Sequence, residues 1–289
     1  MTIIFGLLSA FSYGYADFVG ALAAKKVRAL TVTTVAFCFG LLFAIGLSFF
    51  VGANFSQAAI TSGIYAGIAS GIAISCLYAA LALGPISIVS PLTAVISAII
   101  PVIFDLTTGA SLGSFSLIAI ALVLVAVVLV AFVPGQDFRL PSLRAVLYSI
   151  GAGVGFAGIF VFLDGAPSDS GLATLIVMRI VGIALMLAGL TFAFFKYRPK
   201  QFLETSVFGR SLIWLVLLAG SGDVLGNVFF LVATRAGELA IAAVLTSLYP
   251  VGTILLARIV LKERIAKSQS LGIVLAIAAC VLIAIGKPA

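Results

Sequence analysis

Apolar runs long enough to cross a lipid bilayer recur along this chain from one end to the other. A membrane-spanning helix needs about 20 mostly apolar residues. The runs leave almost no sequence for a water-exposed domain, so the function must reside inside the membrane. The ten predicted spans cover residues 2–24, 31–51, 58–83, 86–106, 114–133, 143–164, 170–195, 208–235, 238–261 and 268–286.

Composition decides which structure these spans form. Hydrophobic residues make up 63% of the chain and charged residues 9%. Because the hydrocarbon core supplies no water to bond the backbone, spans must be helices or closed barrels. Barrel strands would alternate apolar and polar residues, and these runs do not. With short connections, the pattern predicts an all-α integral membrane protein with one compact membrane domain. The first run lacks a preceding basic segment and is interpreted as a retained span, not a cleaved signal peptide.

The basic residues lie almost entirely in connections of one parity. These connections cover residues 25–30, 134–144, 196–210 and 258–267. The exceptions among the 16 lysines and arginines are Arg179, Arg235 and Lys287. Because basic loops stay in the cytoplasm, the pattern predicts a multi-pass inner-membrane protein with both termini outside. The net charge of +7 therefore indicates orientation, and no nucleic-acid partner is expected.

Residue types that commonly carry catalysis or bind metals are scarce. There is no histidine, and Cys38, Cys76 and Cys280 lie isolated in three different spans. No nucleotide-binding, nucleophile-elbow or zinc-protease motif is present. We expect no cofactor, no metal and no enzyme activity, and the chain alone gives no sign of ATP-driven transport.

The chain reads as two repeats of five spans, covering roughly residues 1–135 and 140–289. The clearest match aligns residues 80–84 (ALALG) with residues 233–237 (ATRAG), and a second aligns Cys38 with Arg179. Since five is odd, the second copy must enter the membrane from the opposite side. The sequence thus predicts two inverted five-helix repeats around a central cavity, as in secondary transporters. The alternative is an ancient duplication kept for folding only.

The last third carries a family resemblance. After the ATRAG motif come a small-residue helix, the Tyr249-Pro250 segment, residues 261–264 (LKER) and a closing span. This order resembles the ten-helix EamA branch of the drug/metabolite transporter superfamily, with Lys262 in place of a motif glycine. Arg179 matches an arginine common in the seventh helix of that family, and Cys38 stands where the first half would carry one. The resemblance implies an inverted-repeat fold that moves small metabolites, with amino-acid exporters a prominent bacterial group.

Ionisable groups inside spans are costly in lipid, so they are candidate functional groups. Arg179 either neutralises a carboxylate or binds a substrate carboxylate. Asp223, one helical turn from Asn227, is a candidate for proton coupling or charge relay, or a partner of Arg179. Asp17 is a second coupling candidate, although it could instead reach the membrane interface.

Neutral candidates for substrate binding complete the predicted site. They are Tyr78, Ser90, Thr93, Phe156, Thr246 and Tyr249. Prolines Pro91, Pro101 and Pro250 are expected to interrupt their helices and free backbone carbonyls toward a cavity. The alternatives are hydroxyls bonded within their own helix and aromatic rings that only pack the core.

The leading hypothesis is a secondary transporter that moves small metabolites by alternating access. By resemblance, amino-acid export is the favoured activity, with small-molecule substrates, the lipid bilayer and protons as interaction partners. A drug, nucleoside or sugar permease of the same fold is the alternative. Two hypotheses from other functional classes remain. An intramembrane enzyme would require clustered acidic residues or histidines, and a structural subunit would need no inverted repeats.

Overall fold

The computed structural model describes residues 1–24, 29–84, 86–110, 112–131, 141–197, 210–262 and 264–285. Their regular elements are α1 (Thr2–Ala24), α2 (Ala29–Val51), α3 (Gln57–Leu83), α4 (Ile86–Thr107), α5 (Ser114–Ala131), α6 (Leu143–Asp164), η1 (Ser168–Ser170), α7 (Ala173–Tyr197), α9 (Arg210–Arg235), α10 (Leu239–Thr246), α11 (Tyr249–Val260) and α12 (Lys267–Ile285). Within these ranges an isolated bridge pairs Ala53 with Gly171.

The all-helical membrane fold is confirmed. Ten helical segments of the described chain are long and apolar enough to cross a membrane, and they follow the ten predicted spans to within a few residues. The predicted repeat boundary near residues 135–140 and much of the basic loops lie outside the described residues.

The prolines behave differently from one another. Pro91 and Pro101 lie inside the continuous helix α4, so the expectation that they interrupt it is wrong. In the ninth span the helix does break, because α10 ends at Thr246 and α11 begins at Tyr249 with Pro250 in its first turn. A proline fits the first turn because its missing N–H would have no helical partner there.

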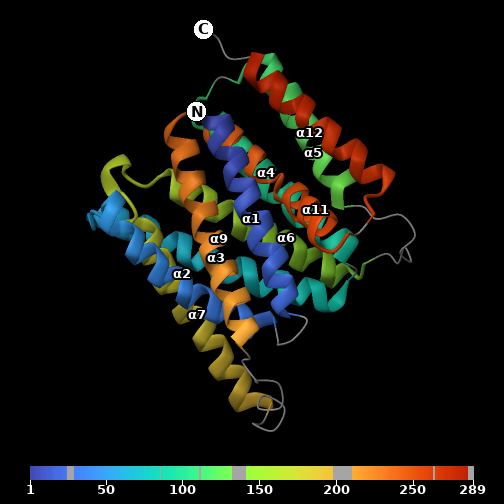
Figure 1. The fold of residues 1–289 in the computed structure, drawn as a ribbon. Helices are drawn as coiled ribbons and strands as arrows, with labels where there is room; N and C mark the ends of the chain where they lie inside the picture. The colour runs from blue at the N-terminus through green and yellow to red at the C-terminus, as the bar shows by residue number, and fades with distance from the viewer. Residues whose placement is uncertain are drawn as a thin grey trace.

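The helix contacts show how the two halves fit together (Figure 1). Helix α1 packs along α9, and α6, the first helix of the second half, packs along α3. The contact of α2 with α9 corresponds in the same way to that of α7 with α3. The contacts of α2 with α7 and of α5 with α12 each join equivalent helices of the two halves. Every one of these contacts has its counterpart when the halves are exchanged. Such reciprocity is what a pseudo-two-fold axis between inverted repeats requires.

Glycines set the closest of these contacts. A β-carbon on Gly63 would lie 2.7 Å from Cβ of Val177, and one on Gly67 would lie 2.6 Å from Cβ of Val181. Small residues let helix backbones approach in lipid, where dispersion contacts and not the hydrophobic effect hold helices together. Gly63 and Gly67 therefore let α3 approach α7 closely.

Gly67→Val is expected to destabilise this contact. The new side chain would meet Val181 and the Met178 carbonyl oxygen, 2.9 Å from the β-carbon, and overpacking costs roughly 1–3 kcal/mol. The melting temperature in detergent should fall. Gly189→Val on α7 is the matched control, because a β-carbon there meets nothing within 4 Å. Equal melting temperatures for the two variants would contradict the packing seen here.

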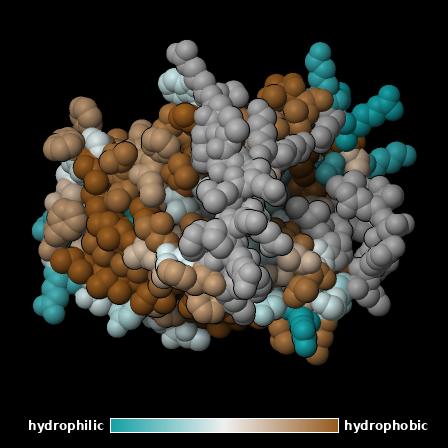
Figure 2. All heavy atoms as spheres, turned by 90° about the horizontal axis from the view of Figure 1, so that it is seen from below, coloured by the Kyte–Doolittle hydropathy of each residue, from teal (hydrophilic) through white to brown (hydrophobic). Residues whose placement is uncertain are grey.

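The outer flank of the bundle is apolar. Large hydrophobic side chains are exposed on many of the helices, among them Trp214 on α9 and Ile277 on α12. Figure 2 shows hydrophobic side chains gathered over one flank, with hydrophilic ones mostly toward the rim. This surface suits acyl chains, so the polar residues inside the bundle are the ones that require a functional explanation.

Candidate functional site

A partly buried ion pair connects helices that do not follow one another in the chain. The Arg179 guanidinium on α7 donates to the Asp223 carboxylate on α9, with the two side chains 3% and 30% exposed. Between them lies α2, whose Phe37 ring centroid is 4.5 Å from Cζ of Arg179. Pairing with Arg179 was one of the two interpretations of Asp223, and it is the arrangement found.

The repeat register around Arg179 follows from two glycines. Gly67 and Gly220 each lie 17 residues before the glycine that closes the repeated ALALG or ATRAG motif. A β-carbon on Gly67 would collide with the carbonyl oxygen of Met178, and one on Gly220 with that of Ala36. Met178 and Ala36 therefore occupy equivalent positions in the two halves.

Phe37, and not Cys38, is thus the counterpart of Arg179. The sequence alignment is one residue out of register here, and Cys38 is exposed. The Arg179 guanidinium lies over the ring of Phe37, the equivalent residue of the first half. The guanidinium therefore lies where α2 and α7 meet, at the pseudo-two-fold axis.

Arg179 retains an unused donor. Its Nε is buried and has no hydrogen-bond partner among the described residues. A buried polar N–H without a partner carries a desolvation penalty of about 1–3 kcal/mol. Such a donor is available to an oxygen acceptor on a bound molecule.

Asn227, one turn after Asp223 on α9, supports the helix turn that carries the ion pair. Its Nδ2 donates to the backbone carbonyl of Asp223 at 2.8 Å, and the side chain is buried. The predicted shared helix face is present, but the amide bonds the backbone and not the carboxylate. Asn227 thus steadies the helix turn that carries Asp223.

Asp17 is exposed on α1, to one side of its apolar stripe. Ile4, Leu7, Leu8 and Phe11 are the exposed large apolar side chains of this helix. At about 100° per residue, Asp17 lies roughly 140° around the helix from Ile4 and roughly 80° from Leu7. Asp17 has no hydrogen-bond or ion-pair partner in the part of the chain that the structure describes.

The stretch of α1 that carries Asp17 packs against α9 and α11. A β-carbon on Gly222 of α9 would lie 2.8 Å from the Tyr15 ring, and one on Gly226 would lie 2.8 Å from the Tyr13 ring. Gly14, one turn before Asp17, lies against the backbone carbonyl of Tyr249 on α11. Tyr78 of α3 and Tyr249 are also within electrostatic reach of the carboxylate. Asp17 therefore lies beside the helix that carries Asp223.

One hydroxyl pair holds a tyrosine of this region in place, because Tyr78 on α3 hydrogen-bonds Thr33 on α2. Tyr249, at the start of α11, acts electrostatically together with Ser90 of α4 and with Asp17. The predicted residues Tyr78, Ser90 and Tyr249 therefore belong to the surroundings of Asp17.

Three groups of this site were missing from the sequence-based set. Tyr13, four residues before Asp17, shares its helix face, and that spacing was a usable signal. Phe37 and Thr33 reach the site only through the packing of α2, which no local pattern reveals.

Three other predicted residues lie away from this cluster. Thr93 donates to the carbonyl of Ser149 at 3.3 Å and bridges α4 and α6. Phe156 packs against a buried apolar cluster that includes Phe160. Thr246 is fully buried at the end of α10, and its hydroxyl has no hydrogen-bond partner among the described residues.

Hydrogen bonds join several connections between helices on one side of the bundle. Residues 52–54, residues 167–172 and Arg235 form what we call the clasp. Leu172 N donates to Gly52 O at 3.0 Å, Asn54 N to Ser170 O at 3.0 Å, and Asn54 Nδ2 to Asp169 Oδ2 at 3.1 Å. The clasp thus joins the α2–α3 connection of the first half to the α6–α7 connection of the second.

Two further contacts reinforce this side. Arg235 donates to the Pro167 carbonyl at 3.3 Å and to Oγ of Ser170 at 3.2 Å. Asp105, at the end of α4, accepts a 2.8 Å hydrogen bond from the backbone N–H of Ala240 in the first turn of α10. The carboxylate of one half caps a helix of the other, a role that the sequence did not predict.

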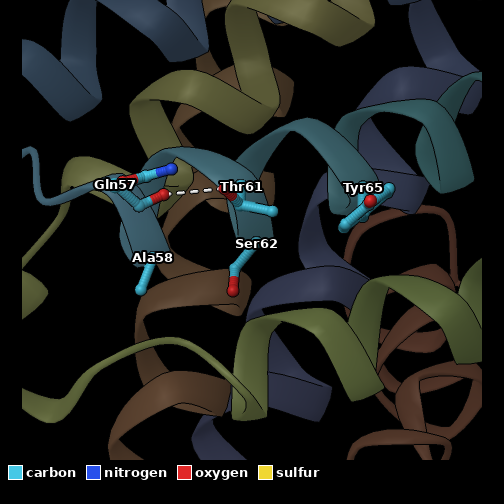
Figure 3. A pocket seen from close by; sticks show the side chains of 5 residues that line it. All are labelled: Gln57, Ala58, Thr61, Ser62 and Tyr65. Atoms are coloured by element: carbon cyan, nitrogen blue, oxygen red, sulfur yellow. Dashed lines mark hydrogen bonds between the residues drawn. The ribbon is translucent and has the colours of Figure 1, made fainter.

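Surface hollows are lined by residues outside the predicted site. One is lined by Gln57, Ala58, Thr61, Ser62 and Tyr65 on the first turns of α3, where the Thr61 hydroxyl bonds the Gln57 carbonyl (Figure 3). A second is lined by Arg258, Arg264 and Ile265. The described residues contain no group of three or more His, Cys, Asp or Glu that could hold a metal ion.

The described residues form ten helices that are long and apolar enough to span a membrane, in two halves whose contacts mirror each other. This architecture is that of a polytopic membrane protein of the transporter type. The sequence profile of the EamA-like transporter family matches residues 1–132 and again residues 143–285. The chain belongs to this family. Its members are membrane transporters of small molecules.

Comparison with solved structures supports the fold. One crystal structure of a protein superposes with a TM-score of 0.77 at 14% sequence identity, over 98% of this chain and 96% of that chain. At this identity the likeness concerns the fold alone. No curated protein sequence matches the chain.

Proposed function

We propose that this protein is a secondary transporter that exports amino acids across the bacterial inner membrane by alternating access. The observation that carries the proposal is the ion pair of Arg179 and Asp223, with an exposed Asp17 on the helix that packs against α9, at the contact between the inverted halves. Buried charge of this kind is costly in a membrane, and a substrate pathway explains its presence.

The arrangement supports alternating access in physical terms. In inverted repeats, exchanging the conformations of the two halves moves the opening from one side of the membrane to the other. A site on the axis stays in place during that exchange. Tyr249 supports this proposal because it lies at the break between α10 and α11, where helix halves could tilt separately. We assign the two repeats to residues 1–135 and 140–289.

Charge and geometry also suggest an orientation. Under the positive-inside rule the basic connections lie in the cytoplasm, and the clasp then faces outside with both termini. Gly237, near the clasp, lies against Thr2 at the start of α1. Asp17 is then about 22 Å further along that helix, toward the cytoplasm. The structure would represent a state closed to the outside.

Export from cells tests the proposal. Cells that express the protein and are preloaded with labelled amino acids should lose the label faster than cells that lack it, and an imposed pH gradient distinguishes proton coupling from facilitated diffusion. Equal loss for every amino acid, with protein shown to be folded in the membrane, would sink the amino-acid assignment. Sugars, nucleosides and drugs would then be examined.

Arg179→Lys is expected to slow this export about tenfold or more while leaving folded protein in the membrane. Lysine keeps the charge but loses the planar fork and the Nε–H that would face a substrate carboxylate. Initial efflux rates, normalised to folded protein, measure the effect. Unchanged efflux would show that Arg179 does not bind substrate.

A further inference from the structure

The central cluster carries an unbalanced charge. Arg179 and Asp223 neutralise each other, and Asp17 remains with no cation against it among the described residues. Of the helices that pack against α1, α9 carries Asp223, and α11 carries Arg258 just after Leu256 and Ala257, which pack near Phe18. With both carboxylates ionised, the group formed by Arg179, Asp223 and Asp17 has a net charge of one negative unit.

The surroundings of Asp17 suit an ammonium group. Tyr13 shares the helix face of Asp17, Tyr249 packs against the preceding turn at Gly14, and aromatic faces attract cations. The tyrosine hydroxyls can also accept hydrogen bonds from an ammonium. Asp17 is exposed, so a dissolved cation can reach it.

An independent observation points to a second contact of the same ligand. Nε of the buried Arg179 lacks an acceptor among the described residues. A carboxylate or carbonyl oxygen on the ligand would supply it. The cluster therefore has two groups that a ligand could satisfy. Nε of Arg179 can donate to an oxygen, and the Asp17 carboxylate can bind a positive charge.

Resting on the proposed transport function, we infer that the substrate is an ammonium compound of net charge +1 that also presents an oxygen acceptor, as basic amino acids do. Asp17 is the residue that selects the extra positive charge. A zwitterionic or acidic amino acid would leave the site with uncompensated negative charge in a medium where that is costly.

Uptake into liposomes by the purified full chain tests this inference, with labelled lysine, norleucine and glutamate. Norleucine has the same chain length as lysine and lacks only the terminal ammonium. We expect saturable lysine uptake about tenfold or more above norleucine, and still less glutamate uptake. Asp17→Asn should reduce the lysine-to-norleucine ratio toward one, and Asp17→Glu should keep most of it. Asp164→Asn, at the end of α6, is the matched control and should leave the ratio unchanged.

A binding measurement separates failure of this inference from failure of the transport proposal. Lysine should raise the melting temperature of the wild type in detergent more than norleucine does, and the difference should vanish in Asp17→Asn. Equal uptake of lysine and norleucine, or a ratio that survives Asp17→Asn, would overturn the inference and leave transport intact. Preferential lysine binding without flux would support the inference and contradict transport, and neither binding nor flux would overturn both.

Discussion

Replacing Arg179 with alanine is expected to destabilise the protein by about 3–5 kcal/mol, because the change leaves the Asp223 carboxylate unpaired in the bundle. The loss of the guanidinium also removes the contact with the Phe37 ring. The melting temperature and the yield of monodisperse protein in detergent measure the effect.

A second substitution separates the two contributions. In the Arg179→Ala background, Asp223→Asn removes the unpaired charge and should restore part of the lost stability. Arg144→Ala is the control, since Arg144 is exposed at the start of α6 and should have little effect. A melting temperature of Arg179→Ala equal to that of the wild type would rule out the ion pair as a structural element.

Locking the clasp is expected to abolish transport. The Asn54 and Asp169 side chains are 3.1 Å apart at their hydrogen bond, so cysteines at these two positions should be within cross-linking reach. If the clasp side must open in every cycle, a cross-link between the halves stops flux almost completely. Oxidation should block efflux from cells or vesicles, and a reducing agent should restore it.

The cross-link needs a clean background and matched controls. The native cysteines at positions 38, 76 and 280 are first replaced by alanine, and Cys38 matters most because it is exposed. The single variants Asn54→Cys and Asp169→Cys should be insensitive to the oxidant. A fully cross-linked protein that transports at the uncross-linked rate would show that the clasp is not a gate.

The spans were predictable because lipid imposes a length and an apolar composition on each helix. What the sequence could not show is how a proline acts in its context. Pro91 and Pro101 are accommodated within α4, whereas Pro250 stands at the start of α11. The difference depends on neighbouring packing, which can compensate the lost backbone hydrogen bond in one helix and not in another.

The candidate site was predictable where charge marks it. Arg179 and Asp223 stand out in apolar spans, and the structure pairs them. The register that makes Phe37 the counterpart of Arg179 rests on the close approach of Gly67 and Gly220 to neighbouring backbone, which is a tertiary property. The clasp escaped prediction for the same reason, since polar residues of short connections gave no signal of their mutual contacts.

Transport by the purified chain alone tests the central claim most directly. The protein is reconstituted into liposomes, and uptake of labelled amino acids is followed with and without an imposed pH gradient. Saturable uptake that unlabelled substrate competes away, and that Arg179→Lys reduces, is the predicted result. No uptake of any amino acid by protein that is folded and inserted would contradict the account.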